Sequence, residues 1–276
     1  MRLDFMIDSD HCNMRLDDFF YQRGISKKLV KDSRNHGEIL LNGEKAYLCQ
    51  KTALNDEVSI VFPKETSNVI PIKMPLDIVY EDEYVMVVDK QAGLATIPNR
   101  MYLKDSLGNA IMHYYNEHHI ESAVHFVNRL DKDTSGLLLV AKSRYVHDFY
   151  SRDIKKVHRV YHCLVEGNPG EGTIDAPIAH RPDHATKRMI DENGARAVTH
   201  YKTLKTYENN TSLVECVLET GRTHQIRVHM ASIGHPLVGD ALYNEHPGTF
   251  YLDSVEISFP HPFDSKIYHF KKEDRF

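Results

Sequence analysis

One acidic residue, Asp131, lies in a run whose residue types favour a reacting group. Residues 125–143 read HFVNRLDKDTSGLLLVAKS. The turn-forming residues 134–136 lead into a short apolar run that predicts a buried strand. Asp131 would then sit on a tight connection between core elements, where a carboxylate needs a partner because burial of an unpaired charge is costly. Positive charge from Arg129, Lys132 and Lys142 is nearby in sequence. An Asp that only caps a turn would fit the same pattern, so the residues alone leave both interpretations open.

A tyrosine with a possible chemical role lies in the next predicted strand. Residues 159–167, RVYHCLVEG, alternate so that Tyr161 shares a face with Cys163 and Val165. Such a tyrosine is either a core aromatic or a side chain that stacks on a base and exchanges a proton through its hydroxyl.

A cation, Arg222, lies where we expect a helix to begin. Within residues 220–239, TGRTHQIRVHMASIGHPLVG, Thr223 is the expected cap of a helix starting near His224, and Gly234 is expected to end it. Helix residues predicted to face the core are Ile226, Met230 and Ile233. The helix dipole and the Arg222 guanidinium would both favour an anion in front of them. That anion could be an ionised Asp131 or a phosphate, and a purely structural Arg222 is equally compatible with the sequence.

The bulk composition indicates a soluble, cytoplasmic globular protein. The 276 residues are 41% hydrophobic and 26% charged. No apolar stretch approaches the roughly 18 residues of a membrane span, and the start, MRLDFMIDSD, does not resemble a secretory signal. The four cysteines are far apart in sequence, so we expect them to be reduced.

The chain divides into a small module at 1–62, a linker at 63–72 and a large domain at 73–276. Within the first part, the spacing of apolar residues predicts a short helix from Leu16 that ends at Gly24. Ser26 would cap a second, basic helix, Asn42-Gly43 predicts a hairpin turn, and residues 58–61 predict a strand. Five cations fall within twelve positions of this module, Arg23, Lys27, Lys28, Lys31 and Arg34. They form either a solvated helix face or a surface for nucleic acid, although the net charge of the chain is −5.

The run around Asp131 closely resembles the central motif of the RluA-type RNA pseudouridine synthases. The matching residues are Arg129, Leu130, Asp131, Thr134, Ser135, Gly136 and residues 137–139. The resemblance implies that Asp131 is catalytic, that Tyr161 is the active-site tyrosine and that Arg222 pairs with Asp131. It also implies that Ile226 lines the pocket and that Arg129 fills or holds the space left by an extruded uridine. Two residues depart from the family pattern, Asn128 in place of His and Gln91 in place of Pro.

The expected fold class is α+β, with a mixed, mostly antiparallel central sheet flanked by helices. The small module resembles the αL RNA-binding domain of a ribosomal small-subunit protein, which commonly precedes such a synthase domain. Further cations expected to contact the RNA backbone are Lys155, Lys156, Arg159, Lys187, Arg188 and Arg196.

The activity implied is the conversion of uridine to pseudouridine in structured RNA, with ribosomal RNA favoured over transfer RNA. This isomerisation needs no cofactor or metal, and the sequence carries no GxGxxG or P-loop motif. The resemblance also implies a monomer. The alternatives are a non-catalytic RNA-binding or ribosome assembly factor on the same fold, which Asn128 and Gln91 would allow, and a nucleotide or carbohydrate hydrolase.

Overall fold

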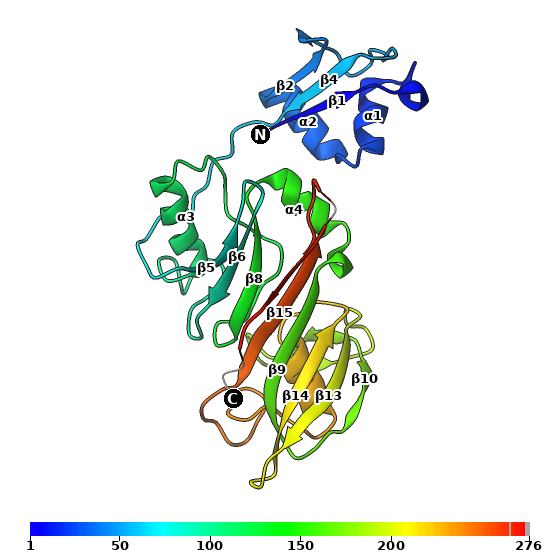
Figure 1. Ribbon diagram of the computed structural model, residues 1–276. Coiled ribbons are helices and arrows are strands. Elements are labelled where there is room, and N and C mark those ends of the chain that lie inside the picture. Colours follow the sequence, from blue (N-terminus) through cyan, green and yellow to red (C-terminus); the bar gives the residue numbers. More distant parts are fainter. Residues whose placement is uncertain (265, 274–276) are drawn as a thin grey trace.

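The described residues form two main sheets, each with its own hydrophobic core, and a separate two-stranded sheet (Figure 1). The structure is a computed structural model that describes residues 1–264 and 266–273. A small four-stranded sheet with two helices is built from the first 61 residues, and a ten-stranded sheet runs the length of the remaining body. Among the described residues, no helix is long and apolar enough to cross a membrane.

The small sheet has the strand order β1-β4-β2-β3. Its elements are β1 (Arg2–Met6), a 3₁₀ turn at Ser9–His11, α1 (Leu16–Gln22), α2 (Lys27–His36), β2 (Glu38–Leu41), β3 (Glu44–Lys45) and β4 (Glu57–Val61). The predicted cap of α2 is confirmed, because the Ser26 hydroxyl accepts a hydrogen bond from Leu29 N. The predicted hairpin turn is also confirmed, with positive φ angles of 54° at Asn42 and 81° at Gly43. Strand β1, which the sequence did not reveal, pairs antiparallel with β4.

Residues 63–76 contain no helix or strand and connect the small sheet to the body. Glu65 accepts a hydrogen bond from Arg144 N at 2.7 Å and contacts the His125 ring. Two further contacts join the first 62 residues to α4 (Arg144–Ser151). Asp32 of α2 lies 3.0 Å from the Arg144 guanidinium, and Phe62 stacks on Tyr145 with ring centroids 5.4 Å apart.

The large sheet is mixed but mostly antiparallel, as predicted. Its order is β10 (Glu171–Asp175), β13 (Val198–Thr206), β14 (Thr211–Leu218), β9 (His158–Glu166), β15 (Leu252–Pro260), β8 (Ser135–Ala141), β6 (Val85–Lys90) and β5 (Asp77–Glu81). Strand β16 (Ile267–Lys271) pairs with β15, and β7 (His125–Phe126) pairs with β8. The β8–β15 ladder is parallel, whereas the other ladders between described strands are antiparallel.

Helices cover both faces of the large sheet, and strand periodicity decides which residues they meet. In β8, Leu138 and Val140 share a core with α3 (Leu107–Glu117) and α5 (Gln225–Ser232), together with Tyr161 of β9. Leu137 and Leu139 point to the opposite face, where α4 packs. Two further strands, β11 (Ile178–His180) and β12 (Arg188–Ile190), form a separate hairpin. A 3₁₀ turn lies at Ile154–Lys156.

Candidate active site

A cleft of about 780 Å³ opens on the face of the large sheet that carries Tyr161. Segments far apart in sequence line it, namely residues 95–102, 126–134, 154–161, 218–227 and Leu252. The volume lies in the range of pockets that enclose small organic groups. The cleft brings together all five site residues predicted in the large domain, Arg129, Asp131, Tyr161, Arg222 and Ile226.

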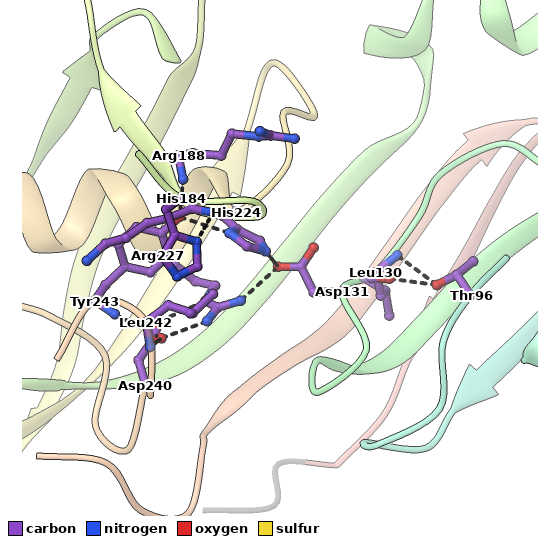
Figure 2. Close-up of polar contacts among 11 residues, drawn as sticks. Thr96, Leu130, Asp131, His184, Arg188, His224, Arg227, Asp240, Leu242 and Tyr243 are labelled. Carbon is purple, nitrogen blue, oxygen red and sulfur yellow. Dashed lines mark hydrogen bonds and ion pairs between the residues drawn. The ribbon is translucent and has the colours of Figure 1, made fainter. Parts of the chain in front are cut away.

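The backbone on both sides of Asp131 is fixed by the segment that follows β6. The buried Thr96 hydroxyl donates to Leu130 O at 2.6 Å and lies 3.3 Å from Leu130 N (Figure 2). On the other side of Asp131, Lys132 O accepts from Gly93 N and from the fully buried Lys90 ammonium, each at 2.9 Å. Asp131 therefore lies on a loop that hydrogen bonds hold in place on both sides of the residue.

The Lys90 ammonium also donates to the carbonyls of Gln91 and Leu94, at 2.9 and 2.7 Å. The loop with Gln91 in place of Pro is thus held by a buried charge. The second departure from the family pattern, Asn128, is buried and accepts a hydrogen bond from Leu139 N at 2.9 Å. Asn128 therefore ties the Asp131 loop to β8.

The Asp131 carboxyl group is about a quarter exposed, at 26% of its side-chain surface, and faces two nitrogen-bearing groups. Its Oδ2 lies 3.5 Å from Arg227 Nη1 and 3.8 Å from His224 Nε2. Figure 2 shows the carboxyl group directed toward these two side chains and away from Leu130. The positive charge of Arg227 therefore lies directly opposite the Asp131 carboxyl group.

Arg227 is held rigidly from behind. Its Nε and Nη2 atoms donate to the two oxygens of Asp240, each at 2.7 Å, and Asp240 is completely buried. Asp240 also accepts from the backbone nitrogens of Leu242 and Tyr243, at 2.9 and 3.2 Å. The guanidinium lies over the rings of Tyr243 and Phe250, at 5.2 and 5.1 Å.

His224 is hydrogen-bonded to Tyr243 through its Nδ1 atom. Tyr243 Oη accepts from Arg188 N at 2.7 Å and lies 2.8 Å from His224 Nδ1, so its hydroxyl proton is free to point at that nitrogen (Figure 2). In the neutral tautomer that accepts this bond at Nδ1, the ring proton is on Nε2, which faces Asp131. Burial lowers the pKa of His224 below its usual value, an effect opposed by Asp131 and reinforced by Arg227.

The predicted partnership of Arg222 with Asp131 is corrected by this geometry. Arg222 is exposed, and its Nε donates to Arg196 O at 3.0 Å. The helix begins at Gln225 and its N-cap is His224, in a left-handed conformation with φ 58° and no side-chain cap, so Thr223 does not cap it. Because the chain makes this left-handed turn before α5, the guanidinium that reaches Asp131 comes from Arg227, in the second position after Gln225.

Tyr161 lies in β9 and is 4% exposed, with its side chain lining the cleft. Burial raises the pKa of the Tyr161 phenol above its ordinary value; the Arg159 guanidinium opposes the rise, and the Asp131 charge adds to it. The phenol is therefore protonated at neutral pH and can donate a hydrogen bond within the cleft.

The remaining predicted RNA contacts are distributed more widely. Arg129 is exposed at the cleft wall, and Ile226 is buried there. Lys142, expected near Asp131, instead pairs with Glu81 at 2.8 Å at the far end of β8. The cations of the small module, Arg23, Lys27, Lys28, Lys31 and Arg34, are all exposed.

The other candidate backbone contacts have varied surroundings. Lys155 lines the cleft and lies 3.6 Å from Glu219, and Arg196 pairs with Asp175 at 3.1 Å. Lys187 lies over the Tyr243 ring, Lys156 lies over the Phe149 ring, and the Arg188 backbone binds Tyr243. Arg159 differs from all of these because it is buried.

Four polar site residues were missed by the sequence reasoning, namely His224, Arg227, Asp240 and Tyr243. A usable signal was present in α5, where every residue from Gln225 to Met230 is buried although three of them are Gln, Arg and His. Polar side chains on a core-facing helix need specific partners. Within the described part of the chain, no group of three or more His, Cys, Asp or Glu side chains could hold a metal ion.

Comparison with known proteins identifies the family. The sequence pattern of RNA pseudouridylate synthases matches residues 84–232, which include Asp131, Tyr161 and Arg227. The chain belongs to this family. A member of the RNA pseudouridylate synthases is an isomerase that acts on RNA, and the RluA-type resemblance of the Asp131 run is confirmed.

Several pseudouridine synthases align with most of the chain. An uncharacterized RNA pseudouridine synthase of Bacillus subtilis, YjbO, is 40% identical over 259 residues, which are 90% of this chain and 91% of the relative. The ribosomal large subunit pseudouridine synthase D of Zymomonas mobilis is 38% identical over 242 residues, 78% of this chain and 74% of the relative. The solved structure of human RNA pseudouridylate synthase domain containing 1 superposes with a TM-score of 0.60 at 26% identity, over 77% of this chain and 87% of that one.

Proposed function

We propose that this synthase isomerises specific uridines of ribosomal RNA and that Asp131 is its reacting carboxylate. The observation that carries the role of Asp131 is its position on a fixed loop at the cleft wall, facing a guanidinium that is itself locked by Asp240. An ionised carboxylate in this setting can attack the sugar, add to the uracil ring or remove a sugar proton.

The side chains around Asp131 can bind the extruded nucleotide and exchange protons with its base. The protonated Tyr161 phenol can donate a hydrogen bond to a base or exchange a proton with it, and Arg129 is placed to occupy the space that an extruded nucleotide leaves. Arg227 and His224 face the Asp131 carboxylate and orient it.

Two observations support ribosomal RNA as the substrate. The relative in Zymomonas mobilis is described as a ribosomal large subunit pseudouridine synthase. The small module, which we assign to residues 1–62 and regard as an RNA-binding domain of the αL type, exposes five cations on and next to α2. Residues 63–72 then act as the connection to the catalytic domain, at 73–276.

Two variants test the role of Asp131. Asp131→Asn removes the charge with little change in shape, and we expect a loss of at least about 10³-fold in tritium release from RNA labelled at uracil C5. Asp133→Asn, which alters an exposed residue of the same loop, is the matched control and should retain turnover. Full turnover by Asp131→Asn would remove this residue from the chemistry, and a wild-type protein that binds RNA but releases no tritium would identify a non-catalytic binding factor.

The substrate is tested by mapping pseudouridines in cells with and without the gene. We expect one or a few sites to disappear from large-subunit ribosomal RNA and to return with the wild-type gene but not with Asp131→Asn. Loss of sites in transfer RNA alone would overturn the ribosomal target while leaving the isomerase activity intact.

A further inference from the structure

A buried arginine in the cleft wall, Arg159, has no carboxylate partner among the described residues. Arg159 lies in β9 two residues before Tyr161, so both side chains project from the same face of the sheet into the cleft. Arg159 is only 2% exposed. Arginine is seldom buried to this degree unless it is paired.

The hydrogen bonds of Arg159 use little of its capacity. Its Nε donates to Val157 O at 3.1 Å, but Nη2 is buried without a hydrogen-bond partner among the described residues. No described carboxylate lies within ion-pair distance of it, in contrast to Arg227, which has both Asp240 and Asp131. A guanidinium offers five donors in a fixed fork that matches carboxylate and phosphate groups.

A buried cation without a counter-ion is unfavourable in the free protein, and the cost is recovered when a ligand supplies the negative charge. The substrate of this enzyme family is RNA, whose anionic groups are its phosphates, whereas uracil carbonyls are neutral. Gly221 lies beside the guanidinium, where a Cβ atom would come within 3.0 Å of Arg159 Nη1. The glycine at 221 therefore lets the Arg159 guanidinium lie close to the backbone of this segment, where a side chain would crowd Nη1.

We infer that Arg159 forms a phosphate-binding subsite for the backbone of the RNA strand that carries the target uridine. This inference rests on the proposed function, since it takes the Asp131 cleft to be the place where the nucleotide enters. Arg159 would fix the nucleotide by its backbone while Tyr161, on the same face of β9, meets the base. Burial without a carboxylate partner distinguishes Arg159 from the exposed cations of the cleft, which are solvated or lie beside an acidic side chain.

Arg159→Met is the main test, because methionine keeps the apolar stem and removes the charge. The RNA is total RNA, labelled at uracil C5, from cells that lack the gene. We expect KM to rise ten- to hundredfold while kcat at saturating RNA changes less than about threefold. The slope of log affinity against log salt should fall by about one, as for the loss of one phosphate contact. Lys271→Met is the matched control, since Lys271 is exposed on β16 outside the cleft.

Two further measurements separate this role from a structural one. Arg159→Met should unfold at the same or a higher temperature than the wild type, because an uncompensated buried charge is replaced by an apolar group. Gly221→Ala keeps the charge but displaces the guanidinium, and we expect it to raise KM in the same direction. A destabilised Arg159→Met with unchanged KM and salt slope would overturn the subsite. A fall in kcat with unchanged KM would do so as well, since Arg159 would then act through Tyr161.

The affinity for RNA and its salt dependence are also measured in the full chain carrying Asp131→Asn, by filter binding of the same RNA. In that background the affinity and its salt slope report on Arg159 alone. A wild-type protein without activity would defeat the proposed function, whereas equal binding with and without Arg159→Met would defeat only the phosphate subsite.

Discussion

Asp240 binds the guanidinium of Arg227 through both carboxylate oxygens at 2.7 Å, and this pair determines which way Arg227 can face. Two of the three guanidinium nitrogens are occupied by Asp240, so the third, Nη1, is left to face Asp131 at 3.5 Å. The orientation of the cation at the proposed reacting group is therefore set by a residue that does not itself touch Asp131.

Replacement of Arg227 tests this relationship. Lysine retains the charge but cannot bind Asp240 in a bidentate manner and reach Asp131 at the same time. We expect Arg227→Lys to lower kcat/KM about 100-fold, which corresponds to roughly 2.7 kcal/mol. Arg222→Lys should cost no more than about threefold, because Arg222 faces Arg196 O instead. Equal losses in the two variants would restore Arg222 as the partner of Asp131.

The hydrogen bonds between Thr96 and Leu130 should contribute to both stability and rate. Thr96→Val is nearly isosteric but leaves the buried Leu130 carbonyl without its 2.6 Å donor, at a cost of about 1–3 kcal/mol. Because the same bonds hold the Asp131 loop, we also expect kcat to fall, by about tenfold or more. Urea unfolding and single-turnover rates measure the two effects. A stability loss without a change in rate would show that the loop keeps its position without Thr96.

Gly136 should not tolerate any side chain. Its φ is +108°, and a Cβ atom there would lie 2.3 Å from Ser254 O of β15. We expect Gly136→Ala to destabilise the protein by more than about 3 kcal/mol, since backbone strain adds to a clash with a parallel neighbour strand. Gly170→Ala is the control, with φ +73° and open space around it, and should cost only about 1–2 kcal/mol. Similar melting temperatures for the two variants would contradict the clash.

Stability should fall on mild acidification because of buried neutral histidines. Burial lowers the pKa of His229, whose ring lies 2.9 Å from Thr199 Oγ1 and 3.0 Å from Ala176 O. The pKa of histidine in the unfolded chain is about 6.5. Below that pH the imidazole of His229 binds a proton in the unfolded chain but stays neutral in the folded protein. The stabilisation present above that pH is therefore lost as the pH falls, by up to about 1.4 kcal/mol per pH unit for each such group.

Unfolding free energies between pH 7.5 and 5 check this expectation. His229→Gln should flatten the pH dependence, because glutamine keeps a donor and an acceptor but does not titrate. The remaining slope would come from His147 and His224, whose pKa values burial also lowers. Exposed His36→Gln is the control. An unchanged slope in His229→Gln would show that its ring protonates in the folded protein.

Much of the secondary structure followed from local patterns. The apolar run of β8, the alternation of β9, the Asn42-Gly43 turn and the Ser26 cap each depend on neighbouring residues, and each is present. Strand β1 was not predicted, because a five-residue segment with two inward side chains becomes a strand only when β4 supplies its hydrogen bonds.

The sequence by itself determined the family and five of the residues that line the cleft, because these depend on contiguous motifs and on strand periodicity. Only the tertiary structure decided that Arg227, and not Arg222, faces Asp131, because the choice depends on a left-handed turn at His224 and on Asp240, which lies thirteen residues after Arg227. The sequence likewise could not show that Arg159 Nη2 has no hydrogen-bond partner among the described residues, since this depends on every element that folds around the side chain.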